Sequence, residues 1–195
     1  MAASRRIVMV GISGVGKTTL LETVVRSLRA SGKQVAVVSF GTMMLEEARR
    51  QGISDRDALR SLPTEEQVRL QTNAAESIAA SDDDVVIVDT HAFVNTKFGY
   101  YPGLPERVLR IINPTSYISV SANPEEIYRR RMNDTTRNRD RITVAGIKQE
   151  LGMQAAMVSA CSVISGSPVK LVVNRDGRVD EAANDVIRAA GLNGA

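Results

Sequence analysis

The sequence contains few cysteine, histidine and aromatic residues, and it has no long apolar run. Its single cysteine, Cys161, excludes an internal disulfide, which fits a reducing compartment. Its single histidine, His91, excludes a metal site built from several histidines. No apolar stretch is long enough to cross a membrane, and the short apolar segment near the N-terminus does not have the layout of a signal peptide. We therefore expect a soluble protein with no membrane contact.

The composition is that of one globular domain. The chain has 195 residues, of which 43% are hydrophobic and 24% are charged, enough for a sizeable core. Neither a shift in composition nor an internal repeat marks a second domain. The net charge is +3, and 20 of the 25 cationic residues are arginine. Arginine binds phosphate in a bidentate manner, but a genomic preference for arginine would give the same ratio, so the positions of the arginines matter more than their number.

The chain is organised around Gly-Ile-Ser-Gly-Val-Gly-Lys-Thr at residues 11–18. This segment matches the phosphate-loop pattern G-x-x-x-x-G-K-[ST] at every specified position. An apolar run precedes it and an amphipathic stretch follows it, which is the strand–loop–helix context that the motif requires. Amides at the helix start face the anion together with the positive end of the helix dipole, Lys17 can reach the β- and γ-phosphates, and the Thr18 hydroxyl can hold Mg²⁺. The motif predicts binding of a nucleoside triphosphate.

Apolar runs alternate with helical patterns along the rest of the chain. The expected strands are 5–11, 34–39, 85–89, 116–121 and 169–174, and the expected helices are 17–31, 43–51, 63–80, 123–134, 143–164 and 179–191. Strands that alternate with helices predict βαβ units and a parallel sheet covered on both faces. We therefore expect one three-layer α/β domain with the P-loop nucleoside triphosphate hydrolase fold, a five-stranded parallel sheet and insertions.

Several local features follow from the same patterns. The run 34–39 does not alternate, which predicts a strand buried on both faces, and residues 40–42 are expected to form a turn. Thr64 and Gln67 have the spacing of a capping box. Residues 90–105 are rich in glycine, proline and aromatic residues, which predicts a long loop, and such loops are usually functional.

Ligands of a parallel sheet bind at the carboxyl ends of its strands. Asp89 ends a buried strand, where it could hold Mg²⁺ directly or through water; a turn carboxylate with no ligand is the alternative. His91 follows closely and could contact a phosphate or the acceptor, but a structural histidine fits equally well. A regulatory GTPase would need Asn-Lys-x-Asp, which is absent; the segment beginning at Asn174 resembles it superficially.

A dense run of arginines lies between residues 129 and 141. On a solvated helix face acidic partners would be interspersed, whereas only Asp134 and Asp140 intervene here, and phosphoryl transfer needs a cationic clamp of this kind. A solvated basic face or a nucleic-acid patch is the alternative. Three consecutive helix positions cannot all point at one site, so some of residues 129–131 must face away. The arginines are Arg129, Arg130, Arg131, Arg137, Arg139 and Arg141.

The acceptor side has no obvious general base. A hydroxyl acceptor needs a carboxylate near the attacking oxygen, commonly at the end of the second strand, but residues 37–44 contain none and the next is Glu46. An ionised phosphate needs cationic ligands instead of a base. Arg56 and Arg60 offer two such ligands, which favours a phosphate acceptor.

Taken together, the motifs resemble those of the archaeal-type adenylate kinases, which interconvert ATP plus AMP with two ADP. The resemblance covers nearly the whole chain. Its motifs are Gly-Ile-Ser-Gly-Val-Gly-Lys-Thr-Thr (11–19), Val-Ser-Phe-Gly-Thr-Met-Met (38–44), Ser-Asp-Arg-Asp-x-x-Arg (54–60), Val-Asp-Thr-His (88–91), Gly-Tyr-Tyr-Pro-Gly-Leu-Pro (99–105), Arg-Arg-Met-Asn-Asp-Thr-Thr-Arg-Asn-Arg-Asp (130–140) and Val-Val-Asn-Arg-Asp-Gly (172–177).

The resemblance implies a site with two nucleotides and Mg²⁺ in a single kinase domain spanning 1–195. It implies an AMP-binding insertion at about 40–80, a short lid at about 134–142 and a cytoplasmic trimer, with nucleic acid not expected as a partner. ATP would bind along Gly11, Ile12, Ser13, Gly14, Val15, Gly16, Lys17, Thr18 and Thr19. AMP would lie near Phe40, Gly41, Arg56 and Arg60, with His91 as a further candidate; the catalytic residues would be Lys17, Arg137 and Arg139, and the metal ligands Thr18 and Asp89.

Two other classes stay open at this point. One is a small phosphate-loop kinase for another nucleoside monophosphate or for a hydroxyl acceptor. The other is a nucleotide-dependent ATPase associated with nucleic acid, which would hydrolyse ATP without AMP.

Overall fold

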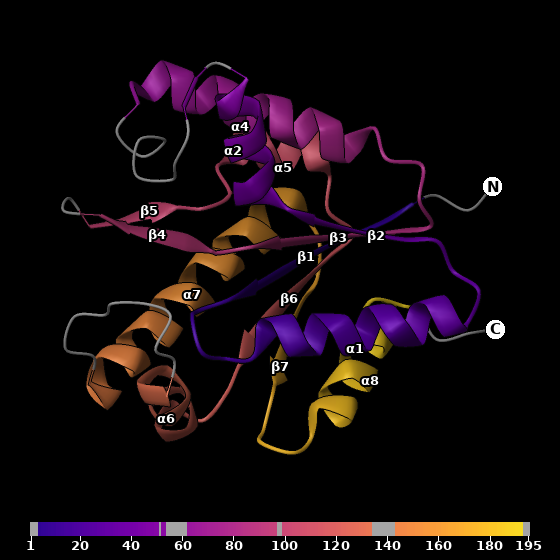
Figure 1. Cartoon of the computed structure of the whole chain (residues 1–195), viewed down its shortest axis with the longest axis vertical. Coiled ribbons are helices and arrows are strands. Elements are labelled where there is room, and N and C mark those ends of the chain that lie inside the picture. Colours follow the sequence, from indigo (N-terminus) through magenta and orange to yellow (C-terminus); the bar gives the residue numbers. More distant parts are fainter. Residues whose placement is uncertain (1–3, 51, 54–61, 97–98, 134–142, 193–195) are drawn as a thin grey trace.

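The computed structural model describes residues 4–50, 52–53, 62–96, 99–133 and 143–192. Within them, five strands form one parallel sheet in the order β2-β3-β1-β6-β7 (Figure 1). The central strand is β1 (Arg5–Gly11), which pairs with β3 (Val85–Thr90) on one side and β6 (Ser116–Ser121) on the other. The edge strands are β2 (Val35–Ser39) and β7 (Val169–Val173).

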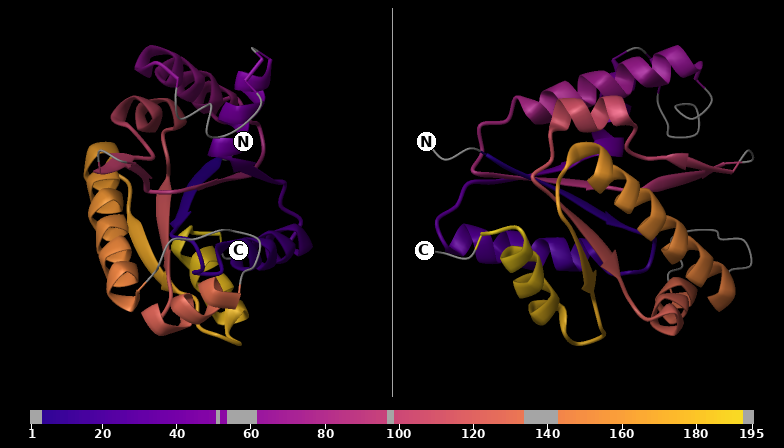
Figure 2. Two further views of the ribbon diagram at one scale, coloured as in Figure 1. Left: turned by 60° about the vertical axis from the view of Figure 1, so that its left-hand side comes forward. Right: turned by 180° about the vertical axis from the view of Figure 1, so that it is seen from behind.

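Helices cover both faces of this sheet, as Figure 1 and the two other views in Figure 2 show. One face carries α1 (Lys17–Ala30) and α8 (Val179–Ala189), which pack on each other and on Ile7 and Met9. The other face carries α2 (Phe40–Arg49), α4 (Thr64–Ala79), α5 (Glu106–Ile112) and α7 (Val144–Ser165). Among the described residues, one further helix, α6 (Pro124–Asn133), follows β6 and packs against α7.

Two cores result from the alternation of side chains along the central strand. Ile7 and Met9 point to the α1/α8 face and Val8 and Val10 to the opposite face, and all four are fully buried. A strand that is apolar at every position therefore needs a helical layer on each side. The predicted three-layer α/β fold with a five-stranded parallel sheet is confirmed.

Two predictions about the second strand are wrong. β2 lies at the edge of the sheet and pairs with β3 alone, so Val37 is 40% exposed instead of buried. The expected turn at residues 40–42 belongs to α2, which begins directly at Phe40. The Phe40 side chain packs in the core with Met44, one helical turn later, and this contact draws the backbone into a helix at once.

The expected long loop at 90–105 is also wrong in part. It contains an antiparallel hairpin of β4 (Phe93–Thr96) and β5 (Gly99–Pro102), in which the Phe93 and Tyr100 rings meet edge to face with centroids 4.8 Å apart. After the hairpin, a Cβ at Gly103 would lie 2.0 Å from the His91 carbonyl oxygen. Glycine is therefore required there by close packing of the returning chain, which the composition alone did not distinguish from a flexible loop.

Two helix starts differ in how they are capped. Asn123 caps α6, because its Oδ1 accepts a hydrogen bond from the Glu125 amide at 2.9 Å. The capping box at Thr64 does not form; Thr64 is already the first residue of α4, and the Gln67 amide group donates to the Leu62 carbonyl at 2.8 Å instead. Across the residues that the structure describes, no helix combines the length and the apolar character needed to span a bilayer.

Candidate nucleotide-binding site

The phosphate loop joins the end of β1 to the start of α1, so the strand–loop–helix context is confirmed. The turn into α1 is made at Gly16, whose φ of 79° lies in the left-handed region that favours glycine. Buried leucines on α1 anchor the helix, and its first exposed side chains, Thr18 and Thr19, stand at the amino end. The loop therefore presents the positive end of α1 and two hydroxyls at the carboxyl end of the sheet.

Lys17 and Asp89 form an ion pair beneath this loop. Their Nζ and Oδ1 atoms are 2.7 Å apart, and Nζ also donates to the Thr90 carbonyl at 2.5 Å. The sheet creates this contact, because Asp89 is the register partner of both Met9 and Ser39 and so lies at the carboxyl end of the three strands. Two residues predicted from separate motifs are thus brought together.

Burial and the ion pair act in opposite directions on the charge of Lys17. Burial of the side chain, of which 11% is exposed, lowers the pKa of Lys17 below its ordinary value of 10.5. The negative charge of Asp89 and its hydrogen bond act in the other direction and favour the ammonium form. Asp89 therefore keeps a cation in a place from which burial would otherwise tend to remove the charge.

The oxygen atoms at this point suit Mg²⁺. The Thr18 hydroxyl is exposed and the Asp89 side chain is 30% exposed, and both are hard oxygen donors. In the described part of the chain, no cluster of three or more His, Cys, Asp or Glu side chains could hold a metal by itself. The donor set fits an ion that keeps several waters and is held largely by phosphate, as Mg²⁺ commonly is.

The predicted acceptor residues lie in different surroundings. Phe40 is 3% exposed and belongs to the hydrophobic core, whereas at Gly41 a Cβ would meet no described atom within 4 Å apart from the local helix backbone and chain neighbours. His91 is exposed directly after β3. Arg56 and Arg60 lie outside the described residues.

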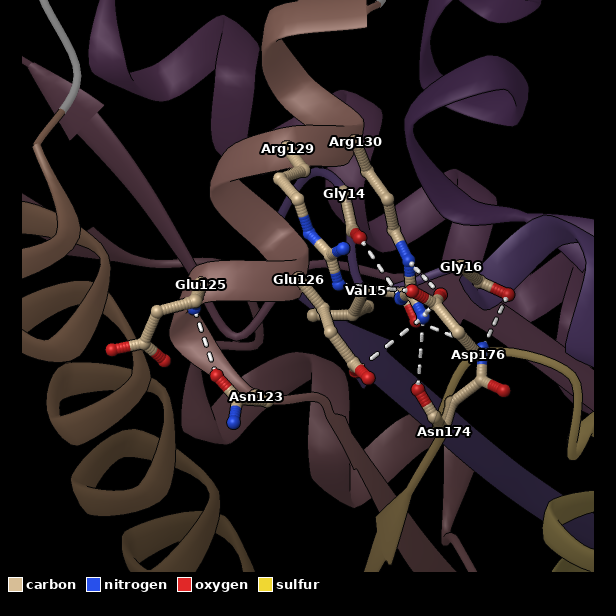
Figure 3. Close-up of polar contacts among 10 residues, drawn as sticks. All are labelled: Gly14, Val15, Gly16, Asn123, Glu125, Glu126, Arg129, Arg130, Asn174 and Asp176. Atoms are coloured by element: carbon tan, nitrogen blue, oxygen red, sulfur yellow. Dashed lines mark hydrogen bonds and ion pairs between the residues drawn. The ribbon is translucent and has the colours of Figure 1, made fainter.

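Three of the six clustered arginines bind other parts of the protein, as Figure 3 shows for Arg129 and Arg130. Arg129 is exposed and lies 3.4 Å from an Asp176 carboxylate oxygen, and Arg130 donates to the same carboxylate at 3.0 and 2.5 Å. The hydrogen bond from Arg130 is the main cause that lowers the pKa of Asp176, and the positive charges of Arg130 and Arg129 lower it further. Arg131 is buried and pairs with Glu150 on α7, with Nη2 and Oε2 2.6 Å apart.

These contacts change the interpretation of the arginine run. The expectation that residues 129–131 do not all face one site is confirmed, because each has partners within the protein. They are therefore not three open anion ligands, as a basic clamp would need. Arg137, Arg139 and Arg141 lie outside the described residues.

Asn174 is a residue that sequence reasoning missed. It lies just after β7, is 5% exposed, and its Nδ2 donates to the carbonyls of Val15 at 2.9 Å and Gly16 at 3.3 Å (Figure 3). Its segment resembles a guanine-reading motif only superficially. The feature of the sequence that indicates a role for Asn174 is its position, a polar side chain at the carboxyl end of a strand.

Three known proteins that are similar in sequence to nearly the whole of this chain carry one name. Residues 10–148 match a family model described as an AAA domain. The adenylate kinase of Thermoplasma acidophilum is 42% identical over 189 residues, covering 96% of this chain and 100% of the relative. The adenylate kinases of Thermoplasma volcanium (44% over 184 residues; 94% of this chain, 98% of the relative) and Methanocaldococcus jannaschii (38% over 183 residues; 93% and 95%) match similarly.

Solved structures support the fold alone. A shikimate kinase from Bacteroides thetaiotaomicron superposes with a TM-score of 0.59 at 13% identity, covering 97% of this chain and 100% of that one. A shikimate kinase from Aquifex aeolicus gives 0.54 at 16% identity, covering 97% and 99%.

Proposed function

This chain belongs to the adenylate kinase family, and on that basis we propose how its residues transfer a phosphoryl group from ATP to AMP to give two ADP. In this proposal residues 1–195 form one kinase domain, with an AMP-binding insertion at about 40–80 and a lid at about 134–142. The observation that carries it is the Lys17–Asp89 ion pair at the carboxyl ends of β1, β2 and β3, directly under the phosphate loop.

The donor half is formed by residues 11–19. The loop amides and the amino end of α1 bind the phosphates of ATP, and the Thr18 hydroxyl and the Asp89 carboxylate would hold Mg²⁺. When bound, Mg²⁺ neutralises charge on the β- and γ-phosphates. When the triphosphate binds, the Lys17 ammonium group moves from the Asp89 carboxylate to phosphate oxygens. Asp89 therefore pairs with Lys17 only in the nucleotide-free protein.

The acceptor half binds AMP within the insertion, next to the start of α2. Among the described residues, no side chain crowds Gly41 at the carboxyl end of β2, and Arg56 and Arg60 supply cationic ligands for the AMP phosphate. Phe40 contributes by fixing the start of α2 through its burial, and His91 lies at the end of the neighbouring strand β3.

Transfer then needs positioning and charge neutralisation and no general base. An oxygen of the AMP phosphate attacks the γ-phosphorus of ATP, the bond from that phosphorus to the β,γ-bridging oxygen breaks, and ADP leaves with the electron pair. The AMP phosphate is already ionised, so no proton has to be removed. Lys17, Arg137 and Arg139 stabilise the charge that spreads over the oxygens of the moving group.

An acceptor screen tests this function. With ATP held constant, AMP, CMP, UMP and GMP are offered in turn, and ADP is measured by a coupled assay. We expect rapid ADP formation with AMP, with equal amounts of ATP and AMP consumed. Activity confined to another acceptor would assign a different kinase, and slow ATP hydrolysis that ignores AMP but responds to nucleic acid would assign an ATPase.

The ionisation of Lys17 predicts a pH dependence. The ammonium form exists below the pKa and is lost above it, and burial lowers that pKa from 10.5. We therefore expect kcat/KM for ATP to be level near neutral pH and to fall on the alkaline side at a pH below 10.5, because this ratio reports the free enzyme. A profile that stays level past 10.5, with circular dichroism showing folded protein throughout, would contradict the role of Lys17.

We also propose a cytoplasmic homotrimer. The support for self-association is on β7, where Val169, Leu171 and Val173 alternate onto one face and remain 42%, 58% and 45% exposed. The buried free thiol of Cys161 suits a reducing compartment. Sedimentation velocity checks the assembly, and a monomer at all concentrations would refute it; cell fractionation checks the location.

A further inference from the structure

Four consecutive carbonyls of the phosphate loop accept hydrogen bonds from side chains of later elements. Arg131 on α6 donates from Nε to the Ser13 carbonyl at 2.7 Å, and Arg130 donates from Nη1 to the Gly14 carbonyl at 3.3 Å. Asn174, after β7, donates to the next two carbonyls, those of Val15 and Gly16. The loop is therefore held at residues 13–16 by side chains that lie more than 100 positions away in the chain.

These contacts determine the direction of the loop amides. The described peptide bonds are all trans, so each carbonyl points opposite to the N–H of the following residue. Carbonyls of residues 13–15 that point at α6 and at the segment after β7 turn the amides of residues 14–16 to the other side. The Gly16 carbonyl also accepts from the Leu20 amide at 3.1 Å, so α1 itself helps to orient the Lys17 amide. The Val15 amide contacts the Ile12 carbonyl at 3.4 Å within the loop's own turn. The amides of Gly14, Gly16 and Lys17 are left facing away from the arginine and asparagine donors.

Two of the three donors are buried and fixed. The Arg131 side chain is 4% exposed and is held by its ion pair with Glu150, and Asn174 is 5% exposed. A Cβ at Gly16 would lie 2.4 Å from Asn174 Nδ2, so the asparagine amide packs directly on the loop backbone. Hydrogen bonds in such a low-dielectric place are strong and hold a geometry well. Arg130 is more exposed, at 24%, and divides its donors between the loop and Asp176.

We propose that Asn174 and Arg131 are positioning residues that aim the phosphate-loop amides at the triphosphate. They bind the outer, carbonyl side of the loop and act through the backbone without touching the phosphates. The inference rests on the proposed function, because it takes residues 11–19 as the ATP site. Amides that are already oriented before the anion arrives need no reorganisation when it binds.

The decisive variant is Asn174→Leu, which keeps the approximate size of the side chain, adds no charge and removes both donor contacts. Inorganic tripolyphosphate is the probe, because it engages the phosphate loop without a base or ribose, and its Kd is measured by calorimetry on the full chain. We expect Asn174→Leu to raise the Kd about tenfold or more and to raise KM for ATP to a similar extent. The loop amides, which make charge-assisted hydrogen bonds to phosphate, would lose their preorganisation. KM for AMP should change less than about twofold.

Asn184→Leu is the matched control, because Asn184 is exposed on α8 and the same substitution there leaves the loop intact. Arg131→Lys is the second variant and decides the matter if Asn174→Leu does not fold. Lysine keeps a cation for Glu150, but it lacks the second donor nitrogen of the guanidinium group that reaches the Ser13 carbonyl. We therefore expect tripolyphosphate affinity to fall about threefold to tenfold, less than in Asn174→Leu. A merely structural role would lower thermal stability without changing the Kd of the folded protein.

The outcomes separate the two hypotheses. Wild-type protein that binds tripolyphosphate, together with folded variants whose Kd stays within twofold of it, would overturn the positioning role and leave the proposed function intact. Wild-type protein that fails to bind tripolyphosphate would overturn the donor site itself, and the positioning role with it.

Discussion

Replacing Lys17 by methionine should reduce kcat by about a thousandfold or more while the protein stays folded. Lys17 is the one described cation that both stands beneath the phosphate loop and is paired with a strand-end carboxylate, Asp89. Methionine keeps much of the length and the apolar stem of the side chain but removes the charge that offsets the negative charge of the moving phosphoryl group. The loss should therefore appear in kcat far more than in the KM for AMP.

The stability of this variant distinguishes a chemical effect from a folding defect. Removal of Lys17 leaves the buried Oδ1 of Asp89 without its cation, so the variant should be less stable by about 3 kcal/mol. For a protein of this size each kcal/mol corresponds to a shift in Tm of about 2–4 °C. Lys33→Met is the control, since Lys33 precedes β2 at the opposite end of the sheet and should leave turnover unchanged. Near-normal kcat in Lys17→Met would refute the proposed mechanism.

Replacing Arg137 by alanine should lower kcat by about a thousandfold with little change in ATP affinity. The proposed function assigns the clamp on the transferred group to Arg137 and Arg139. The protein partners that Arg129, Arg130 and Arg131 already have favour this assignment. An arginine that contacts the equatorial oxygens chiefly during transfer stabilises the transition state more than the bound substrate, and its loss slows the chemical step.

The matched control is Arg129→Ala. Arg129 is 67% exposed and its one described ion pair, with the exposed Asp176, contributes little to stability. Turnover of this variant should stay within about threefold of wild type. Steady-state kcat and the Kd for ATP are compared across both variants. An unchanged kcat in Arg137→Ala, or an equal loss in Arg129→Ala, would remove Arg137 from the site.

The architecture and the positions of residues 11–18 and Asp89 were predictable because each depends on local sequence signals. The phosphate-loop glycines and the alternation of strands with helices determine where residues 11–18 lie, and Asp89 ends a run of four apolar residues. Both signals place residues at the carboxyl edge of a parallel sheet without any knowledge of contacts. The Lys17–Asp89 pair follows once β1 and β3 are neighbours.

The features that were missed depend on contacts between distant residues. The exposure of β2 is decided by its position at the edge of the sheet, which a single strand's composition does not reveal. The hairpin at 93–102 is formed by side chains that pack across it, in a segment whose glycines and prolines indicate a loop. Asn174 and Arg131 donate to backbone carbonyls near the other end of the chain. Every residue has such a carbonyl, so the sequence does not show which one a side chain will bind.

The Arg131–Glu150 pair has a consequence for how the chain can vary in length. It joins the end of α6 to the second turn of α7 and so holds these two helices together. The entropy cost of closing a segment rises slowly with its length, by about 0.6 kcal/mol for each doubling. Residues could therefore be inserted between these two helices without displacing Ser13, because the anchor that holds the loop lies outside the inserted span. The phosphate loop is insulated from changes in the length of the segment that follows α6.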